Sequence, residues 1–176
     1  MLPLSISLPS LLIEGSDQEF RRLIYRMIIT ESRLIEIRKG IARQVGVSGP
    51  QYTIMMAILH LEGDLGISIG GLAVYLEVTG PHITGEVRKL VALGLVRKTI
   101  NPKDLRGVQV RLSAAGRKRL LGAFGYIRNV NDILFDGVSA EEFRALAKFN
   151  EKFMTNTLLA LAWERKSSDR RPRSAA

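Results

Sequence analysis

The stretch 68–116 constrains the fold of this chain more than any other part of the sequence. Apolar residues at helical spacing predict a short helix over 70–77, and a second helix begins after a turn. Thr79 is a suitable N-cap for the second helix, and Pro81 falls in its first turn, where a missing amide does no harm. Gly94 marks the end of this helix, because glycine readily adopts the left-handed conformation of a helix terminus. Two helices joined by a turn are therefore expected here.

Two short strands follow the helix pair. Residues 96–100 and 108–112 read as an antiparallel hairpin, and the second segment alternates apolar and polar residues as a half-buried strand does. The connection 101–107 is longer than a tight hairpin turn of about two residues, so we expect a projecting loop. Helix, turn, helix and hairpin in this order are the parts of a winged helix, a module that binds duplex DNA.

Positive charge is concentrated in the same part of the chain. The formal net charge is +9, and residues 85–119 contain 10 Lys and Arg against 2 Asp and Glu. Residues 1–84 contain 7 against 8, and residues 120–176 contain 9 against 7. A solvated surface usually mixes charges of both signs, so this segregation favours an anionic partner.

Several classes of site are excluded by composition. The chain has no cysteine, which excludes disulfides, zinc–thiolate sites and thiol redox sensing. Two histidines, His60 and His82, are too few for a His-rich metal cluster, and no nucleophile–base set is found. Gly80 and Gly85 have the spacing of a phosphate-binding P-loop, but Glu86 stands where that motif requires lysine. We therefore expect no enzymatic activity, no metal and no cofactor.

Long helices are expected on both sides of the central stretch. Ser16, Ser48 and Ser139 each precede a Glu or Gln by three residues, which predicts a capping box at three helix starts. The fold class is therefore mainly α with a small β hairpin (α+β). The helices are expected over 17 to about 44, 49 to about 62, 113 to about 135 and 140 to about 163.

The two ends of the chain differ in character. Residues 1–16 form an apolar arm that covers either a partner subunit or its own domain, and the basic tail 164–176 is expected to be disordered. No apolar run reaches the roughly 18 residues of a membrane span. The apolar start also lacks the basic region and the cleavage site of a signal peptide. We expect a soluble cytoplasmic protein without a membrane partner.

The second helix of the pair presents a polar face that is suited to DNA. Such a helix fits the major groove, which is roughly 12 Å wide, and its N-terminal amides favour phosphate. Thr84 and Gly85 are small enough to let the helix approach base edges, while His82 and Arg88 have donors for guanine or phosphate. An ordinary solvated helix face is the alternative. The candidate DNA contacts on this helix are Thr79, Pro81, His82, Thr84, Gly85, Arg88 and Lys89.

The hairpin adds a second group of candidate DNA contacts. Lys103 and Arg106 at the wing tip could reach the adjacent minor groove, where a narrow groove attracts arginine. Asp104 could orient the Arg106 guanidinium by charge-assisted hydrogen bonding, and Lys98 lies on the first strand. A solvated turn with a local ion pair is the alternative. Helix, wing and charge together favour DNA binding.

These residues carry a resemblance to a known family. The most specific part is Asp104-Leu105-Arg106 in the wing, followed by Leu112-Ser113 and by Gly116. The whole resemblance spans roughly residues 17–163, and it is to the MarR family of bacterial transcriptional regulators. Its further residues are Leu72-Ala73, Leu76, Val78-Thr79, Pro81, Ile83-Thr84, Leu90, Gly94-Leu95-Val96 and Val110-Arg111.

The resemblance implies an obligate homodimer on a pseudo-palindromic operator in double-stranded DNA. The chain would then comprise an arm (1–16), dimerisation helices (17–47 and 117–163), a winged helix-turn-helix DNA-binding domain (48–116) and the tail. Members commonly repress transcription, and many release their operator when a small aromatic acid binds between the dimer and DNA-binding regions. A winged-helix architectural or protein-interaction module without an effector is the alternative.

Three departures from the family pattern bear on function. Members often carry arginine where this chain has Gly85, so a base contact could move to His82 or Arg88. Gly70 and Gly71 weaken the first short helix, because glycine is a poor helix former. The redox-sensing members use cysteine, which this chain lacks.

A candidate effector site follows from the same resemblance. Arg38, Tyr52, Met56 and His60 lie on the two helices that line a pocket in similar proteins. Arg38 could pair with the carboxylate of an aromatic acid or with a phenolic ligand, while Tyr52 and Met56 could cover its ring. Ordinary core packing of the Met, Tyr and His side chains is the alternative.

Overall fold

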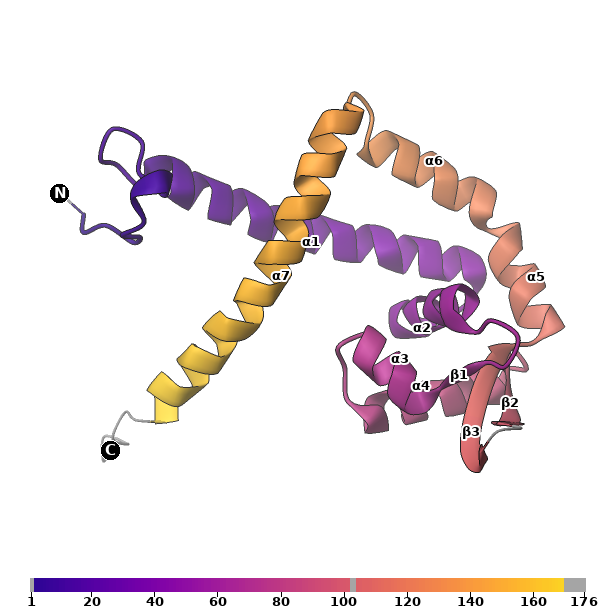
Figure 1. The fold of residues 1–176 in the computed structure, drawn as a ribbon. Helices are drawn as coiled ribbons and strands as arrows, with labels where there is room; N and C mark the ends of the chain where they lie inside the picture. Colours follow the sequence, from indigo (N-terminus) through magenta and orange to yellow (C-terminus); the bar gives the residue numbers. More distant parts are fainter. Residues whose placement is uncertain (1, 102–103, 170–176) are drawn as a thin grey trace, which may run out of the picture. The chain divides into compact units, whose positions relative to one another are not determined.

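The computed structural model describes residues 2–101 and 104–169, without the side chains of 100–101, 104–107 and 169. It divides into two compact units, Met1–Arg128 and Asn129–Ala176, whose helices and strands are labelled in Figure 1. The predicted fold class, mainly helical with a small sheet, is confirmed. The elements are η1 (Pro9–Leu11), α1 (Gln18–Val45), α2 (Gly49–Leu61), β1 (Ile67–Ser68), α3 (Ile69–Tyr75), α4 (Gly80–Ala92), β2 (Val96–Asn101), β3 (Asp104–Leu112), α5 (Ala114–Gly122), α6 (Phe124–Leu134) and α7 (Ala140–Asp169).

Helix α2 forms the centre of the first unit. The predicted capping box starts it: Ser48 Oγ accepts from the Gln51 amide at 3.4 Å, and the Gln51 side chain accepts from the Ser48 amide at 3.1 Å. Ile54, Met55 and Ile58 are buried, and the helix contacts α1, α3, α4, α5 and β3. Each such side chain contributes roughly 1.5–3 kcal/mol of hydrophobic stabilisation. Helix α2 is therefore the common support on which the helix pair and the hairpin are mounted.

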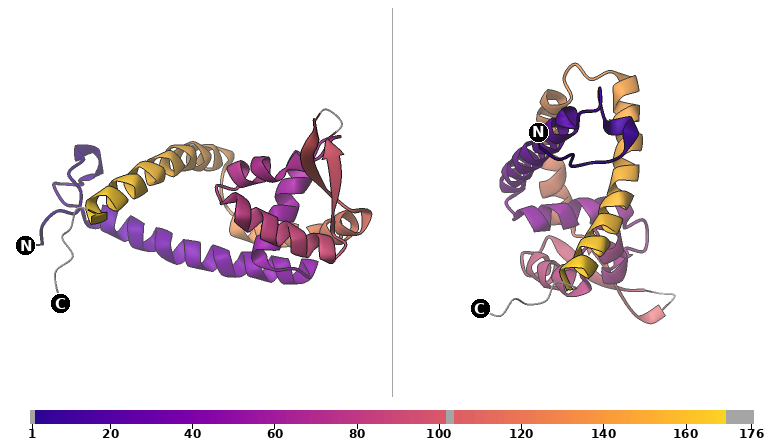
Figure 2. Two further views of the ribbon diagram at one scale, coloured as in Figure 1. Left: turned by 90° about the horizontal axis from the view of Figure 1, so that it is seen from below. Right: turned by 90° about the vertical axis from the view of Figure 1, so that its left-hand side faces the viewer.

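The three strands form an antiparallel sheet in the order β1-β3-β2. Ile67 of β1 faces Val110, and Val96 of β2 faces Leu112. The hairpin of β2 and β3 projects from the helices of this unit (Figure 2). The predicted long loop over 101–107 is wrong, because the strands continue through a register irregularity after Ile100 and pair up to Asn101 and Asp104. The described residues on either side of the irregularity stay paired, as they do on either side of a β-bulge.

The start of α5 explains the Leu-Ser-x-x-Gly motif. Ser113 Oγ accepts from the Gly116 amide at 2.9 Å and donates to the Gly94 carbonyl at 2.6 Å. The Ser113 amide donates to the Leu95 carbonyl at 3.0 Å. A Cβ on Gly116 would lie 2.0 Å from the Leu95 carbonyl oxygen, so only glycine fits. This joint fixes the end of the helix pair against the helix that follows the wing.

The predicted helix boundaries need three corrections. The helix expected from 113 to 135 is broken at Ala123, with the poor helix formers Gly122 and Gly125 beside the break. At the start of α1 the N-cap is Asp17, and Glu19 pairs with Arg22 at 2.7 Å, so the expected box at Ser16 is not formed. The last helix continues to Asp169 rather than ending near 163. The rest of the expected disordered tail, 170–176, lies outside the described residues.

The arm is attached to α1 by polar contacts. The amide and the hydroxyl of Ser5 each donate to Asp17 Oδ2 at 2.6 Å, and Arg21 donates to the same oxygen at 2.9 Å. Arg21 also donates to the Pro3 carbonyl at 2.6 Å. Most apolar side chains of the arm remain exposed, so the arm does not bury them against its own unit. The exposed apolar residues of the arm are Leu2, Leu4, Leu8, Leu11 and Ile13.

The second unit contains the end of α6 and the helix α7. The predicted capping box at Ser139 is present, since Ser139 Oγ accepts from the Glu142 amide and Glu142 accepts from the Ser139 amide. The Phe135 and Phe143 rings meet edge to face across the turn, 5.9 Å apart. Most apolar side chains along α7 are exposed. Within the described residues, no helix combines the length and the apolar character that crossing a bilayer requires.

Candidate nucleic-acid interface

Helix α4 is oriented by three buried side chains. Ile83, Val87 and Leu90 are fully or almost fully buried, and α4 contacts α2 and α3. The opposite side of the helix therefore faces solvent. The predicted contacts Thr79, Pro81, His82, Thr84, Arg88 and Lys89 are all exposed, and Gly85 is half-buried.

The polar groups on α4 are partly engaged with one another. Lys89 Nζ lies 2.7 Å from Glu86 Oε1, and this hydrogen bond is the main cause that lowers the pKa of Glu86. The Thr84 hydroxyl donates to the Gly80 carbonyl at 2.9 Å, which leaves its oxygen lone pairs to accept from a base. A Cβ at Gly85 would meet nothing within 4 Å. Steric crowding therefore does not explain why this position has glycine rather than arginine.

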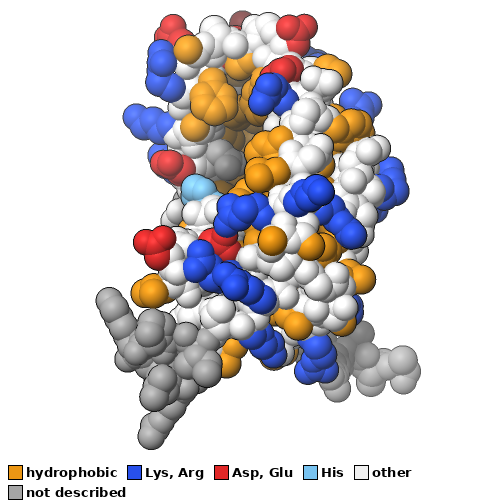
Figure 3. All heavy atoms as spheres, turned by 90° about the vertical axis from the view of Figure 1, so that its right-hand side faces the viewer, with side chains coloured by type: hydrophobic (Ala, Val, Ile, Leu, Met, Phe, Trp, Pro, Cys, Tyr) orange, Lys and Arg blue, Asp and Glu red, His pale blue; other side chains and the backbone are white. Residues whose placement is uncertain are grey.

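The wing supplies fewer described contacts than the sequence predicts. Lys98 is exposed on β2, opposite Val110 of β3. Lys103 lies outside the described residues, as do the side chains of Asp104 and Arg106, so the expected ion pair at the wing tip stays a prediction. In the space-filling view of Figure 3, Lys and Arg side chains gather on the lower half of the face, where they outnumber Asp and Glu.

Two basic residues of the charged segment 85–119 make contacts within the protein. Arg111 donates to the carbonyls of Asp64 and Gly63, and Arg117 pairs with the buried carboxylate of Glu62. None of the three side chains in these contacts was predicted to have a function. Each of these residues is about 50 positions away from its partner in the sequence, so no local sequence pattern predicts the contact.

The candidate effector residues are brought together only in part. Arg38 donates to Thr53 Oγ1 at 3.2 Å, and its guanidinium lies 5.5 Å from the centre of the Tyr52 ring. Burial raises the pKa of Tyr52, and the positive charge of Arg38 opposes that change. Met56 is half-buried, whereas His60 is exposed with its ring 6.2 Å from that of Tyr75 on α3. Sequence reasoning missed Thr53, which joins Arg38 to α2.

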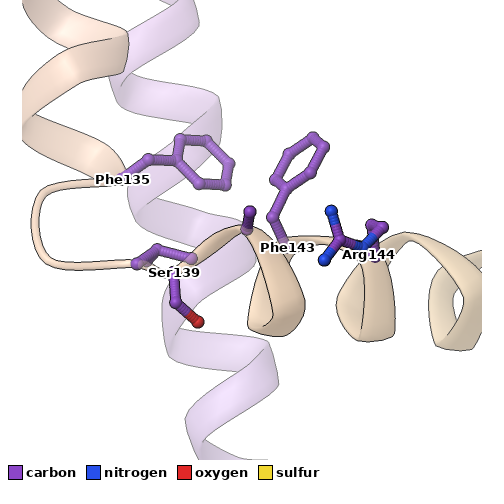
Figure 4. A pocket seen from close by; sticks show the side chains of 6 residues that line it. Phe135, Ser139, Phe143 and Arg144 are labelled. Atoms are coloured by element: carbon purple, nitrogen blue, oxygen red, sulfur yellow. The ribbon is translucent and has the colours of Figure 1, made fainter.

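Each unit has a hollow in its described part. The first unit has a cavity of about 280 Å³ between α2, the end of α3 and the start of α4. The second unit has one of about 410 Å³ at the turn before α7, where Phe135, Ser139, Phe143 and Arg144 lie around the hollow (Figure 4). None of the four candidate effector residues lines the first cavity, although Thr53 and His82 do. The full lining of the first cavity is Pro50, Thr53, Ile54, Leu76, Val78, His82 and Ile83.

A helix-turn-helix of α3 and α4 followed by the β2–β3 hairpin defines a winged helix-turn-helix protein, a class that binds duplex DNA. The model of the MarR family matches residues 45–107, which span this region from the end of α1 to the wing. The resemblance noted in the sequence is thereby confirmed. Beyond this matched segment, the chain has the fold of a transcriptional regulator of this type.

Solved structures agree with this assignment. The transcriptional regulator BldR from Sulfolobus solfataricus is 27% identical with a TM-score of 0.62, over 76% of this chain and 96% of that one. A mutant MarR from E. coli complexed with operator DNA is 20% identical with a TM-score of 0.64, over 78% and 99%. CouR from Rhodococcus jostii RHA1 bound to p-coumaroyl-CoA is 16% identical with a TM-score of 0.67, over 74% and 90%. None of the curated proteins matches the chain.

Proposed function

We propose that the protein is a homodimeric repressor that binds a pseudo-palindromic DNA operator and leaves it when a small aromatic carboxylate or phenol binds. The observation that carries DNA recognition is the exposed polar face of α4, held outward by the buried Ile83, Val87 and Leu90. The fold likeness to a MarR protein complexed with operator DNA supports the same reading. In this proposal Arg88 and His82 contact base edges or phosphates, and the wing contacts the neighbouring minor groove.

Exposed apolar side chains on α1 and α7 support a dimer. Leu23 and Ile28 of α1 and Leu146 and Leu161 of α7 are each 50% exposed or more. Apolar surface of this extent on long helices is typical of an interaction site. A two-fold dimer would place two α4 helices in half-sites about one helical turn apart, roughly 34 Å. The arm, with its exposed leucines, would add to this interface.

The effector part of the proposal has its own support. CouR, of similar fold, binds p-coumaroyl-CoA. In this chain Arg38 lies against Thr53 and Tyr52, and Thr53 lines the cavity that also includes His82 at the start of α4. A ligand carboxylate or phenolate near Arg38 would therefore be close to elements that set the position of the recognition helix.

Selection of bound sequences from a random DNA pool tests the proposal. An enriched palindrome whose binding is lost with one of a panel of aromatic acids supports it in full. Binding without any enriched sequence would support the architectural alternative instead. Sedimentation of the protein tests the dimer. Leu146→Glu should yield monomers, whereas Lys148→Glu, on the opposite side of the same helix, should leave the assembly intact.

A further inference from the structure

Glu62 is a buried carboxylate at the end of α2. It is 4% exposed, and glutamate is almost never buried to this degree unless it is paired. Its Oε2 accepts from the Leu112 amide at 2.8 Å, and its Oε1 forms an ion pair with Arg117. Leu112 is the last residue of β3, and Arg117 lies in α5. One carboxylate thus joins the end of α2, the base of the wing and the helix that follows it.

The contact with Leu112 replaces a missing strand partner. Strand β1 has only two residues, and its pairing with β3 stops at Ile67 and Val110. The Leu112 amide lies beyond this short ladder, and Glu62 supplies the acceptor for it. Leaving a buried amide unpaired would cost free energy comparable to a lost hydrogen bond. The carboxylate therefore completes the edge of the sheet at the wing base.

A second contact fixes the same junction. The Arg111 guanidinium donates to the Gly63 carbonyl at 3.0 Å and also to the Asp64 carbonyl. Both carbonyls belong to the turn that follows α2. The last two residues of β3, Arg111 and Leu112, are therefore both bound to the end of α2, one through its side chain and the other through its amide.

We propose that Glu62 is a positioning residue for DNA binding, which sets the place of the wing relative to the recognition helix. Helix α4 packs on α2. The wing base is bound to the end of α2 through Glu62 and to the turn after it through Arg111, while Arg117 of α5 holds the Glu62 carboxylate. Helix α2 is thus the shared reference for both DNA-binding elements. Glu62 itself is buried and touches no DNA. The inference rests on the proposed function, because positioning matters only if α4 and the wing engage one duplex together.

Glu62→Gln is the direct test, because the amide keeps the shape but loses the ion pair that holds this side chain against the Leu112 amide. Operator affinity should fall about tenfold, the size of one charge-assisted hydrogen bond. The slope of log affinity against log salt should fall by about one phosphate contact. Arg117→Gln should reproduce both effects from the exposed end of the pair. Lys118→Gln, which removes the same charge from the next residue of α5, is the matched control.

A coupling measurement separates positioning from mere stability. Lys98→Ala on the wing should weaken binding in the wild type but have little further effect in the Glu62→Gln protein, whose wing is already misplaced. Arg88→Ala on α4 should keep its full effect in both backgrounds. Thermal melting shows whether each variant is folded, and Arg117→Gln carries the test if Glu62→Gln is not.

Two results would overturn the inference. One is unchanged affinity in both Glu62→Gln and Arg117→Gln. The other is a loss of affinity in which Lys98→Ala and Arg88→Ala both keep their full effects, since that pattern marks a general loss of stability. Failure of the wild type to bind any DNA would instead contradict the proposed function itself.

Discussion

Gly116 shows how one residue of a motif can be explained by a close approach of two backbones. A Cβ there would lie 2.0 Å from the Leu95 carbonyl oxygen, which belongs to the segment entering β2. We expect Gly116→Ala to lower the free energy of unfolding by roughly 1–3 kcal/mol, as overpacking does. Gly85→Ala, in open space on α4, should raise it by about 0.5–1 kcal/mol. Urea denaturation of both variants tests this, and equal effects would contradict it.

Asp17 makes a pH-dependent attachment for the arm. Hydrogen bonds from the Ser5 hydroxyl, then from the Ser5 amide, lower the pKa of Asp17 from 3.8 to about 2, with Arg21 adding to the effect. Because the folded pKa is lowered, the attachment is complete above pH 3.8 and is lost as the pH falls towards 2. Ser5→Ala should raise the pKa of Asp17, as measured by NMR titration of its carboxyl carbon. A pKa still near 2 in that variant would exclude the hydroxyl as the main cause.

At the scale of elements, local features such as helix caps could be predicted from the sequence, whereas contacts between distant residues could not. The capping boxes at Ser48 and Ser139 are present because all their partners lie within one helical turn. The prediction of a long wing loop was wrong, since the β2–β3 ladder continues to Asn101 and Asp104 through an irregular register that no local pattern reveals. Glu62 was missed for the same reason, because its partners follow about 50 residues later along the chain.

The candidate interface was predicted unevenly for a related physical reason. The outward face of α4 follows from helical periodicity around Ile83, Val87 and Leu90, so its exposed residues could be named from the sequence. Arg38 and Tyr52 lie together, and their role towards a ligand stays a prediction. His60 lies beside Tyr75 instead, and Thr53 was overlooked. Side-chain direction on a helix buried on several sides depends on its neighbours, which periodicity alone does not specify.

Ser48 and Ser16 provide an internal comparison at the same scale. Ser48 completes a reciprocal box at the start of α2, whereas Ser16 stands one position before the N-cap of α1. Ser48→Ala should therefore cost about 1 kcal/mol of stability. Ser16→Ala should change stability by less than about 0.5 kcal/mol. Chemical denaturation of the two variants distinguishes them, and a larger cost at Ser16 would contradict the assigned caps.

For the whole molecule, we propose that α4 reads DNA sequence while the wing adds affinity. The two elements can contact the same duplex only if their packing on α2 fixes their relative position. Arg88 is exposed on α4 and Lys98 on β2, so each can be removed without disturbing the core. Their different roles predict different effects on specificity, which a measurement of affinity across many sequences can separate.

The most direct measurement is the affinity of wild type, Arg88→Ala and Lys98→Ala for the selected operator and for its single-base variants at several salt concentrations. Arg88→Ala should remove roughly 1–3 kcal/mol of discrimination at one symmetric pair of base positions. Lys98→Ala should weaken binding to all sequences alike and lower the salt slope by about one. Uniform loss in both variants, with discrimination unchanged, would contradict sequence reading by α4.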